Sequence, residues 1–210
     1  ILAEGYTKSE KEKFEKDLKR FVDFFFEDEP YRSQKNDFNI YGVFKPSEES
    51  GTDLPGADIF VNTVLNTTFW TLGSERYLMT EDNLSMRNLA AHVPYDAIYI
   101  QVNHPRYGGG GIYNQYCTYT TDNQFAKYLY VHEFGHSFTG LADEYYTSDV
   151  AYNDFFKPTV EPVEPNITAL MDPKNIKWKK YLSEGIEIPT PWEKEEFDRF
   201  SYEWLKERNR

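Results

Sequence analysis

The stretch VHEFGHSFTGLADEYY, residues 131–146, contains side chains that could bind a metal ion and activate a water molecule. His132 and His136 are four positions apart, and Glu133 directly follows the first histidine. Residues four apart on an α-helix project from nearly the same side, so both imidazoles can bind one ion. Glu133 is displaced around the helix and could hold a water molecule beside that ion. The pattern HExxH is therefore typical of a zinc site with a glutamate general base.

Composition makes an accidental match improbable. The chain has 210 residues and only four histidines, and chance alone predicts about 0.007 HExxH matches in such a chain. The apolar residues around the motif predict a central, buried helix, where unpartnered histidines and a glutamate would be costly. The alternative reading is a pair of ordinary packed histidines. A metal ion is favoured over that reading because it supplies the missing partner.

A catalytic zinc ion takes three protein ligands and a water molecule, so a third ligand is needed. It could be a glutamate from a second helix, and Glu161 and Glu164 stand at a suitable distance, but the prolines of VEPVEP exclude a regular helix. Alternatively, a glycine ends the first helix and the ligand follows, as in HExxHxxGxxH or its aspartate variant. Gly140 and Asp143 reproduce this spacing one residue late. Asp143 is the predicted third ligand, and Glu144 is its competitor.

These assignments predict Zn2+ as the cofactor, bound by His132, His136 and Asp143, with Glu133 as the catalytic residue. Zinc lowers the pKa of its bound water and polarises the scissile carbonyl. A glutamate beside it can accept the proton of the water and return it to the leaving amine. The expected reaction is hydrolysis of a peptide bond.

Other residues outside the proposed ligand set could also contribute to the site, and the glycine run among them has two interpretations. Four glycines, Gly108 to Gly111, precede a predicted strand. They could form the rim of a cleft whose strand pairs with an extended peptide, or a turn that lets the chain pass closely. Tyr145 and Tyr146 could donate a hydrogen bond to the oxyanion. Cys117 is expected to be a buried, small apolar residue.

The elements that must position the motif follow from apolar periodicity and turn residues. Helices are expected at about 8–27, 80–92 and 192–206 and over the motif itself, and strands at about 38–44, 97–102 and 111–121. The expected N-caps are Thr7, Thr80 and either Thr121 or Asp122. Four prolines between 158 and 173 exclude long regular elements there. Helices alternating with strands predict an α/β fold with a mixed sheet.

Charge and composition exclude other classes of function. The formal net charge is −12 and no Lys/Arg cluster is present, so nucleic acid is not an expected partner. No apolar run approaches the length of a membrane helix. The single cysteine excludes an intrachain disulfide. The expected partner is a protein or peptide substrate, and the oligomeric state stays open.

The segment HEFGHSFTGLADEY resembles the signature of the IgA-peptidase-type zinc metallopeptidases, a bacterial family similar to the metzincins. Other blocks that look like this family are ILAEGYT, FNIYGVF, SGTDLPG, FWTLGSERYL, PYDAIYIQVN, YGGGGIYN, EPNIT and IPTP. The resemblance implies an α/β, metzincin-like zincin catalytic domain with a mixed twisted sheet, a central active-site helix and an irregular C-terminal part. It also implies a zinc endopeptidase that is secreted, periplasmic or at the cell surface of a bacterium and cuts extracellular proteins.

By this resemblance, His132, His136 and a following acidic residue bind zinc, and Glu133 is the base. We expect one catalytic domain over residues 1–210, with an upper lobe of about 1–140, a lower lobe of about 141–210 and an incomplete C-terminus. The methionine turn of metzincin-like enzymes is expected beyond the IPTP block, with Met171 as the alternative. A catalytically silent, zinc-containing binding module on a peptidase scaffold is the alternative function, and the intact Glu133 argues against it.

Overall fold

The computed structural model describes residues 1–144 and 159–208. The chain forms two compact units, Ile1–Asp143 and Glu144–Arg210, which are described separately below. None of the helices in the described part of the chain combines the length and apolar character needed to cross a membrane. The first unit contains the HExxH segment and the sheet. The expected single catalytic domain with two lobes stays a prediction.

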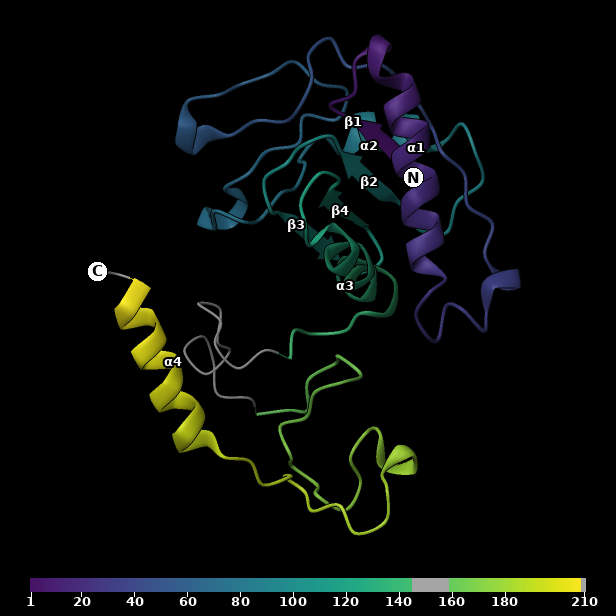
Figure 1. The fold of residues 1–210 in the computed structure, drawn as a ribbon. Helices are drawn as coiled ribbons and strands as arrows, with labels where there is room; N and C mark the ends of the chain where they lie inside the picture. The colour runs from purple at the N-terminus through teal and green to yellow at the C-terminus, as the bar shows by residue number, and fades with distance from the viewer. Residues whose placement is uncertain (145–158, 209–210) are drawn as a thin grey trace. The chain divides into compact units, whose positions relative to one another are not determined.

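A four-stranded mixed sheet lies at the centre of the first unit (Figure 1). Its strands are β1 (Leu2–Glu4), β2 (Tyr99–Val102), β3 (Gly109–Ile112) and β4 (Tyr116–Thr120), in the order β1-β2-β4-β3. The β1–β2 and β2–β4 pairs are parallel, and β3 pairs antiparallel with β4. This order makes β3 an edge strand, and three of the four glycines of the run lie within it. The predicted α/β class with a mixed sheet is confirmed.

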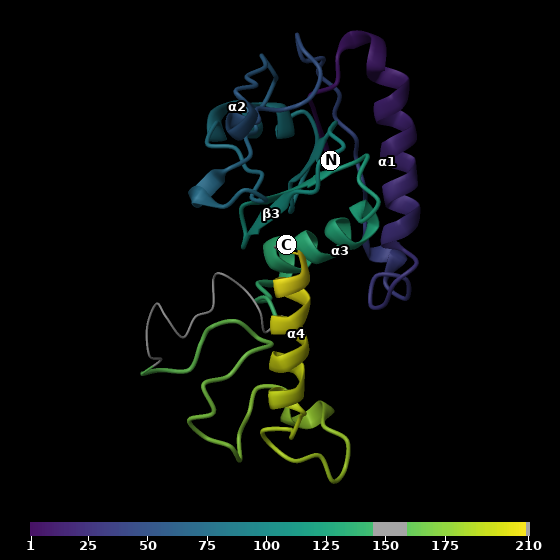
Figure 2. The same cartoon turned by 60° about the vertical axis from the view of Figure 1, so that its left-hand side comes forward.

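Helices cover both faces of this sheet (Figures 1 and 2). They are α1 (Lys11–Phe25), α2 (Asn83–Ala90) and α3 (Ala126–Thr139). Successive side chains of a strand point to opposite faces, and Ile100 of β2 accordingly shares a core with Met86 of α2. Tyr99, its neighbour in the strand, packs instead with Phe21 of α1 and Tyr130 of α3. The sheet is therefore sandwiched between α2 on one side and the pair α1 and α3 on the other.

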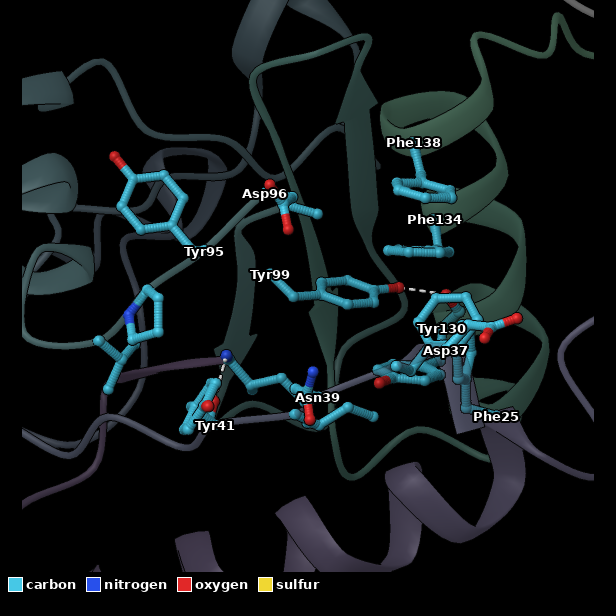
Figure 3. A pocket seen from close by; sticks show the side chains of 16 residues that line it. Phe25, Asp37, Asn39, Tyr41, Tyr95, Asp96, Tyr99, Tyr130, Phe134 and Phe138 are labelled. Atoms are coloured by element: carbon cyan, nitrogen blue, oxygen red, sulfur yellow. Dashed lines mark hydrogen bonds between the residues drawn. The ribbon is translucent and has the colours of Figure 1, made fainter. Parts of the chain in front are cut away.

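The helix α3 presents different residues on its two sides. Phe134 stacks on Phe138 with ring centroids 4.8 Å apart, and both rings line a cavity of about 370 Å³ (Figure 3). Tyr99 from the sheet stacks on Tyr130 in the same aromatic cluster. Residues 132 and 136 lie about half a turn away from residues 134 and 138 around a helix of 3.6 residues per turn. The aromatic side of α3 packs in this cluster, and the packing therefore orients His132 and His136 toward the opposite side of the helix.

Three local expectations from the sequence are wrong. The segment 38–44 is not a strand: Val43 makes only an isolated parallel bridge with Leu2. Helix α2 is capped by Asp82, whose side chain accepts from the Ser85 N–H, and not by Thr80. Helix α3 begins at Ala126 without a side-chain cap, so neither Thr121 nor Asp122 has that role. These errors concern the ends and partners of elements and leave the position of α3 unchanged.

The second unit contains little regular structure among its described residues. Among residues 159–208, it has a turn of 3-10 helix, Lys179–Tyr181, and the helix α4, Lys194–Arg208. Turns and irregular backbone occupy most of residues 159–193. The predicted C-terminal helix therefore exists, and the preceding proline-rich part is irregular, as expected from its sequence.

Candidate metal and catalytic site

Three side chains converge beside the C-terminal end of α3. Nε2 of His132 lies 3.1 Å from Oδ1 of Asp143, and Nε2 of His136 lies 3.1 Å from the same oxygen. The two Nε2 atoms are also 3.1 Å apart. The three atoms form a nearly equilateral triangle, with the histidines provided by the helix and the aspartate by the chain after it. These are the three residues that the sequence names as metal ligands.

The late glycine is accommodated by a longer last turn of the helix. Gly140 ends α3 in the left-handed conformation, with φ of 67°. The Leu141 N–H reaches back to the carbonyl of Gly135 at 3.2 Å, and the Leu141 carbonyl accepts a hydrogen bond from Nδ1 of His136. This wrapped turn absorbs the extra residue. It directs the chain so that Asp143 still meets both histidines.

The donor atoms fit a zinc ion. Tetrahedral zinc with bonds of about 2.0–2.2 Å sets its ligand atoms about 3.3–3.6 Å apart, close to the observed 3.1 Å edges. Two imidazole nitrogens and one carboxylate oxygen are also a donor set typical of zinc. His136 already donates from Nδ1 to a backbone carbonyl, an outer contact that leaves its Nε2 as the ligand atom. The arrangement is therefore suited to one ion bound by His132, His136 and Asp143.

The surroundings of His136 favour its protonated form. Burial disfavours the charged His136 imidazolium, but hydrogen bonds to Asp143 and to the Leu141 carbonyl outweigh burial and raise the pKa of His136 to about 9. Both of its ring nitrogens face acceptors. A bound metal ion replaces the Nε2 proton, so metal binding and protonation compete at this atom.

Glu133 lies beside the triangle and is buried, with 8% of its surface exposed. One ligand atom each from His132, Glu133 and His136 fall within 4.8 Å of one another. Burial raises the pKa of Glu133 to about 7, although the nearby histidines oppose the shift. A carboxyl group with a pKa near neutrality can both accept and return a proton. The charge of a bound ion would lower this pKa again.

The glycine run packs β3 tightly against α3. A Cβ on Gly109 would lie 3.0 Å from Cγ and from Oε1 of Glu133, and one on Gly111 would lie 2.6 Å from the Glu133 carbonyl oxygen. On the other side of the strand, a Cβ on Gly110 would lie 2.1 Å from Sδ of Met79. Backbone atoms therefore require glycine at Gly109 and Gly111, on the face toward α3, whereas at Gly110 the close neighbour is the flexible end of a methionine side chain. These contacts agree with the interpretation that the glycines let the chain pass closely. The position of β3 at the sheet edge is compatible with the other interpretation, a cleft rim whose strand pairs with a peptide.

The competing acidic residues have other partners, all within the second unit. Glu144 accepts a hydrogen bond of 2.7 Å from the Asn166 amide. Glu161 accepts hydrogen bonds from the Met171 N–H, the Thr168 hydroxyl and the Ala169 N–H, which together lower its pKa. Its carboxylate therefore organises the loop around the alternative methionine. Asp143, in the first unit, is the proposed acidic ligand that lies within 3.1 Å of both histidines.

Three further residues were candidates from the sequence, namely Cys117 and the tyrosines at positions 145 and 146. Cys117 is fully buried in β4. The two tyrosines proposed as oxyanion donors, residues 145 and 146, lie outside the described residues.

Two residues near the site were missed from the sequence. The Tyr128 hydroxyl lies 3.3 Å from Nδ1 of His132. Arg76 lies close enough for its positive charge to lower the pKa of Glu133, and its carbonyl accepts from the Gly109 N–H. The i, i+4 spacing to His132 could have indicated Tyr128. No local pattern could have indicated Arg76, because its position depends on a loop that pairs with β3.

Comparison with protein-family models gives a match over residues 1–210 to the model described as IgA Peptidase M64. None of the curated proteins is significantly similar to the chain.

Proposed function

The chain belongs to the IgA peptidase M64 family, and we propose that it is a zinc-dependent endopeptidase in which Glu133 is the catalytic base. Membership in this family supports a peptidase, and hence a hydrolase that acts on a protein substrate. The single observation that carries the zinc-dependent mechanism is the 3.1 Å triangle of His132, His136 and Asp143 donor atoms beside the buried Glu133.

In this mechanism, His132, His136 and Asp143 would hold the ion through their three converging donor atoms. When bound, zinc would lower the pKa of a water molecule and polarise the scissile carbonyl. Glu133 accepts a proton from the attacking water and delivers it to the leaving amine nitrogen. The close approach of β3 at Gly109 limits the positions open to this carboxyl group, which would reduce the reorganisation needed during the reaction.

The edge strand β3 is the proposed binding element for the substrate backbone. At Gly109, a loop already uses this edge: the Leu78 N–H donates to the Gly109 carbonyl, and the Gly109 N–H donates to Arg76. Backbone groups of an antiparallel strand alternate in direction, so Gly111 directs its N–H and C=O to the same outer side. An extended peptide could pair there, next to His136, and present its carbonyl to the metal.

The resemblance of HEFGHSFTGLADEY to the metzincin-like signature supports two further parts of this proposal. The first unit would be the core of a metzincin-like zincin domain, with α3 as its active-site helix. The protein would act outside the cytoplasm, as a secreted, periplasmic or cell-surface enzyme, on extracellular proteins. Export can be tested by fractionating the producing cells and detecting the protein with an antibody. A protein confined to the cytoplasmic fraction would refute that location.

The test of the mechanism is the Glu133→Gln variant of the zinc-loaded protein. We expect it to retain about one zinc ion per chain by elemental analysis and to lose hydrolysis of a broad peptide library. Glu12→Gln is the matched control, because Glu12 is exposed on α1, and this variant should cleave the library like the parent protein. Cleavage by the zinc-loaded Glu133→Gln variant would refute the role of the base. If the zinc-replete parent protein cleaved nothing, the silent binding module would be the better assignment.

A further inference from the structure

The two histidines of the site differ in what holds their outer nitrogen. Nδ1 of His136 is bonded to the backbone carbonyl of Leu141, which belongs to the turn at the end of α3. Nδ1 of His132 lies 3.3 Å from the hydroxyl of Tyr128, one helical turn earlier. The contact to His136 therefore comes from the main chain, whereas the contact to His132 comes from a side chain that can be replaced.

The direction of the Tyr128 contact follows from the geometry of the metal triangle. Nε2 of His132 lies 3.1 Å from Nε2 of His136 and from Oδ1 of Asp143, so it is the atom that faces the ion. A neutral imidazole that binds a metal through Nε2 carries its proton on Nδ1. Nδ1 therefore donates, and the Tyr128 hydroxyl oxygen accepts.

The Tyr128 ring also supports the His132 ring from the side. The two rings are nearly parallel, with an interplanar angle of 24° and centroids 5.1 Å apart. The phenol of a tyrosine ordinarily has a pKa of about 10, so it is neutral at pH 7. A neutral phenol can accept from Nδ1 without adding another negative charge to the site.

We propose that Tyr128 is a positioning residue of the metal site, which sets the ring orientation and tautomer of His132 through a hydrogen bond to Nδ1. This inference rests on the proposed function and goes beyond it, because it adds a residue that touches neither metal nor substrate. Hydrogen-bond partners on the outer nitrogen of a metal-bound histidine fix its tautomer and raise its basicity. Their loss typically weakens metal affinity by about tenfold to a hundredfold.

The experiment compares four forms of the purified protein: the parent, Tyr128→Phe, Tyr128→Gln and Tyr95→Phe. Tyr128→Phe keeps the ring and removes the acceptor. Tyr128→Gln restores a carbonyl oxygen at the same helical position. Tyr95→Phe is the control, since Tyr95 is another partly exposed tyrosine of the first unit, outside the metal triangle. Zinc affinity is measured by competition with a chelator of known affinity, and the visible spectrum is recorded after replacement of zinc by cobalt(II).

We expect Tyr128→Phe to bind zinc about tenfold to a hundredfold more weakly and to change the cobalt spectrum. Tyr128→Gln should recover part of the affinity, and Tyr95→Phe should behave like the parent. Parental zinc affinity and an unchanged spectrum in Tyr128→Phe would overturn the inference and leave the proposed function intact. An equal loss in Tyr95→Phe would also overturn it. If the parent protein bound no zinc, both the inference and the proposed function would fail.

Discussion

Gly109 lies so close to Glu133 that a Cβ on this glycine would stand 3.0 Å from both Cγ and Oε1 of the glutamate. The strand β3 and the helix α3 thus meet at the residue proposed as the catalytic base. This contact explains why the chain has glycine at a position where a strand would ordinarily be weakened by it. It also makes β3 part of the machinery that orients Glu133.

Replacement of Gly109 by alanine should therefore impair hydrolysis more than folding. The added methyl group forces the Glu133 side chain to move and crowds the Thr118 carbonyl, 2.9 Å away. We expect a loss of about 1–3 kcal/mol in the free energy of unfolding, measured with urea, together with a large fall in kcat/KM. Gly110→Ala is the matched control, because its methyl group meets the flexible Met79 side chain on the other face. Equal effects on kcat/KM for both variants would argue against the contact with Glu133.

Removal of the Asp143 carboxylate should release the metal, whereas removal of the Glu144 carboxylate should not. Oδ1 of Asp143 faces both histidines, while Glu144 is bonded to Asn166. We expect Asp143→Ala to lose more zinc affinity than the roughly tenfold to hundredfold cost of losing an outer partner. Glu144→Ala should bind zinc like the parent. Chelator competition measures both, and the opposite ranking would make Glu144 the ligand.

The left-handed turn at Gly140 should tolerate asparagine better than alanine. Its φ of 67° is costly for most residues, and a Cβ there would come within 3.1 Å of the Tyr113 ring. Alanine in this conformation costs about 1–2 kcal/mol, whereas asparagine adopts it more readily. We expect Gly140→Ala to lower both the unfolding free energy and zinc affinity, because the turn directs Asp143 to the histidines. If Gly140→Asn proved as damaging as Gly140→Ala, steric contact with Tyr113 would outweigh backbone strain.

Glu10 should make the stability of the first unit depend on pH. Burial alone would raise the pKa of Glu10, but hydrogen bonds from Thr7, Asn103 and Ser50 outweigh it and lower the pKa. Because the folded pKa lies below the unfolded one, the stabilisation is present above the unfolded pKa. It is lost as the pH falls through the folded value.

In Glu10→Gln, the unfolding free energy at pH 7 should fall by about 1 kcal/mol, the scale for a partly exposed charged acceptor. The variant should also lose less stability than the parent between pH 6 and pH 3. Urea unfolding across this range, with the exposed Glu12→Gln as control, measures the difference. Parallel pH profiles for Glu10→Gln and the parent would exclude the contribution of Glu10.

Most helices and the central strand could be predicted from local sequence patterns, although the N-caps of α2 and α3 could not. Apolar periodicity located α1, the HExxH motif located α3, and a short apolar run located β2, because each pattern depends on neighbours within a few positions. The segment 38–44 has the same apolar character as a strand and was predicted as one. Whether such a segment forms a ladder depends on a partner strand, and here it meets β1 only at the bridge between Val43 and Leu2.

The sequence by itself determined the chemistry available to this protein: His132, His136 and Glu133 share one helix, and a glycine-terminated turn with an acidic residue follows them. The reason is that helical geometry relates residues four apart in any context. The tertiary structure alone decided how the buried Glu133 is held, since its contact with Gly109 joins segments whose spacing in the sequence carries no such information. It also decided the path of the last helical turn, through the Leu141 contact with His136 that brings Asp143 to the histidines.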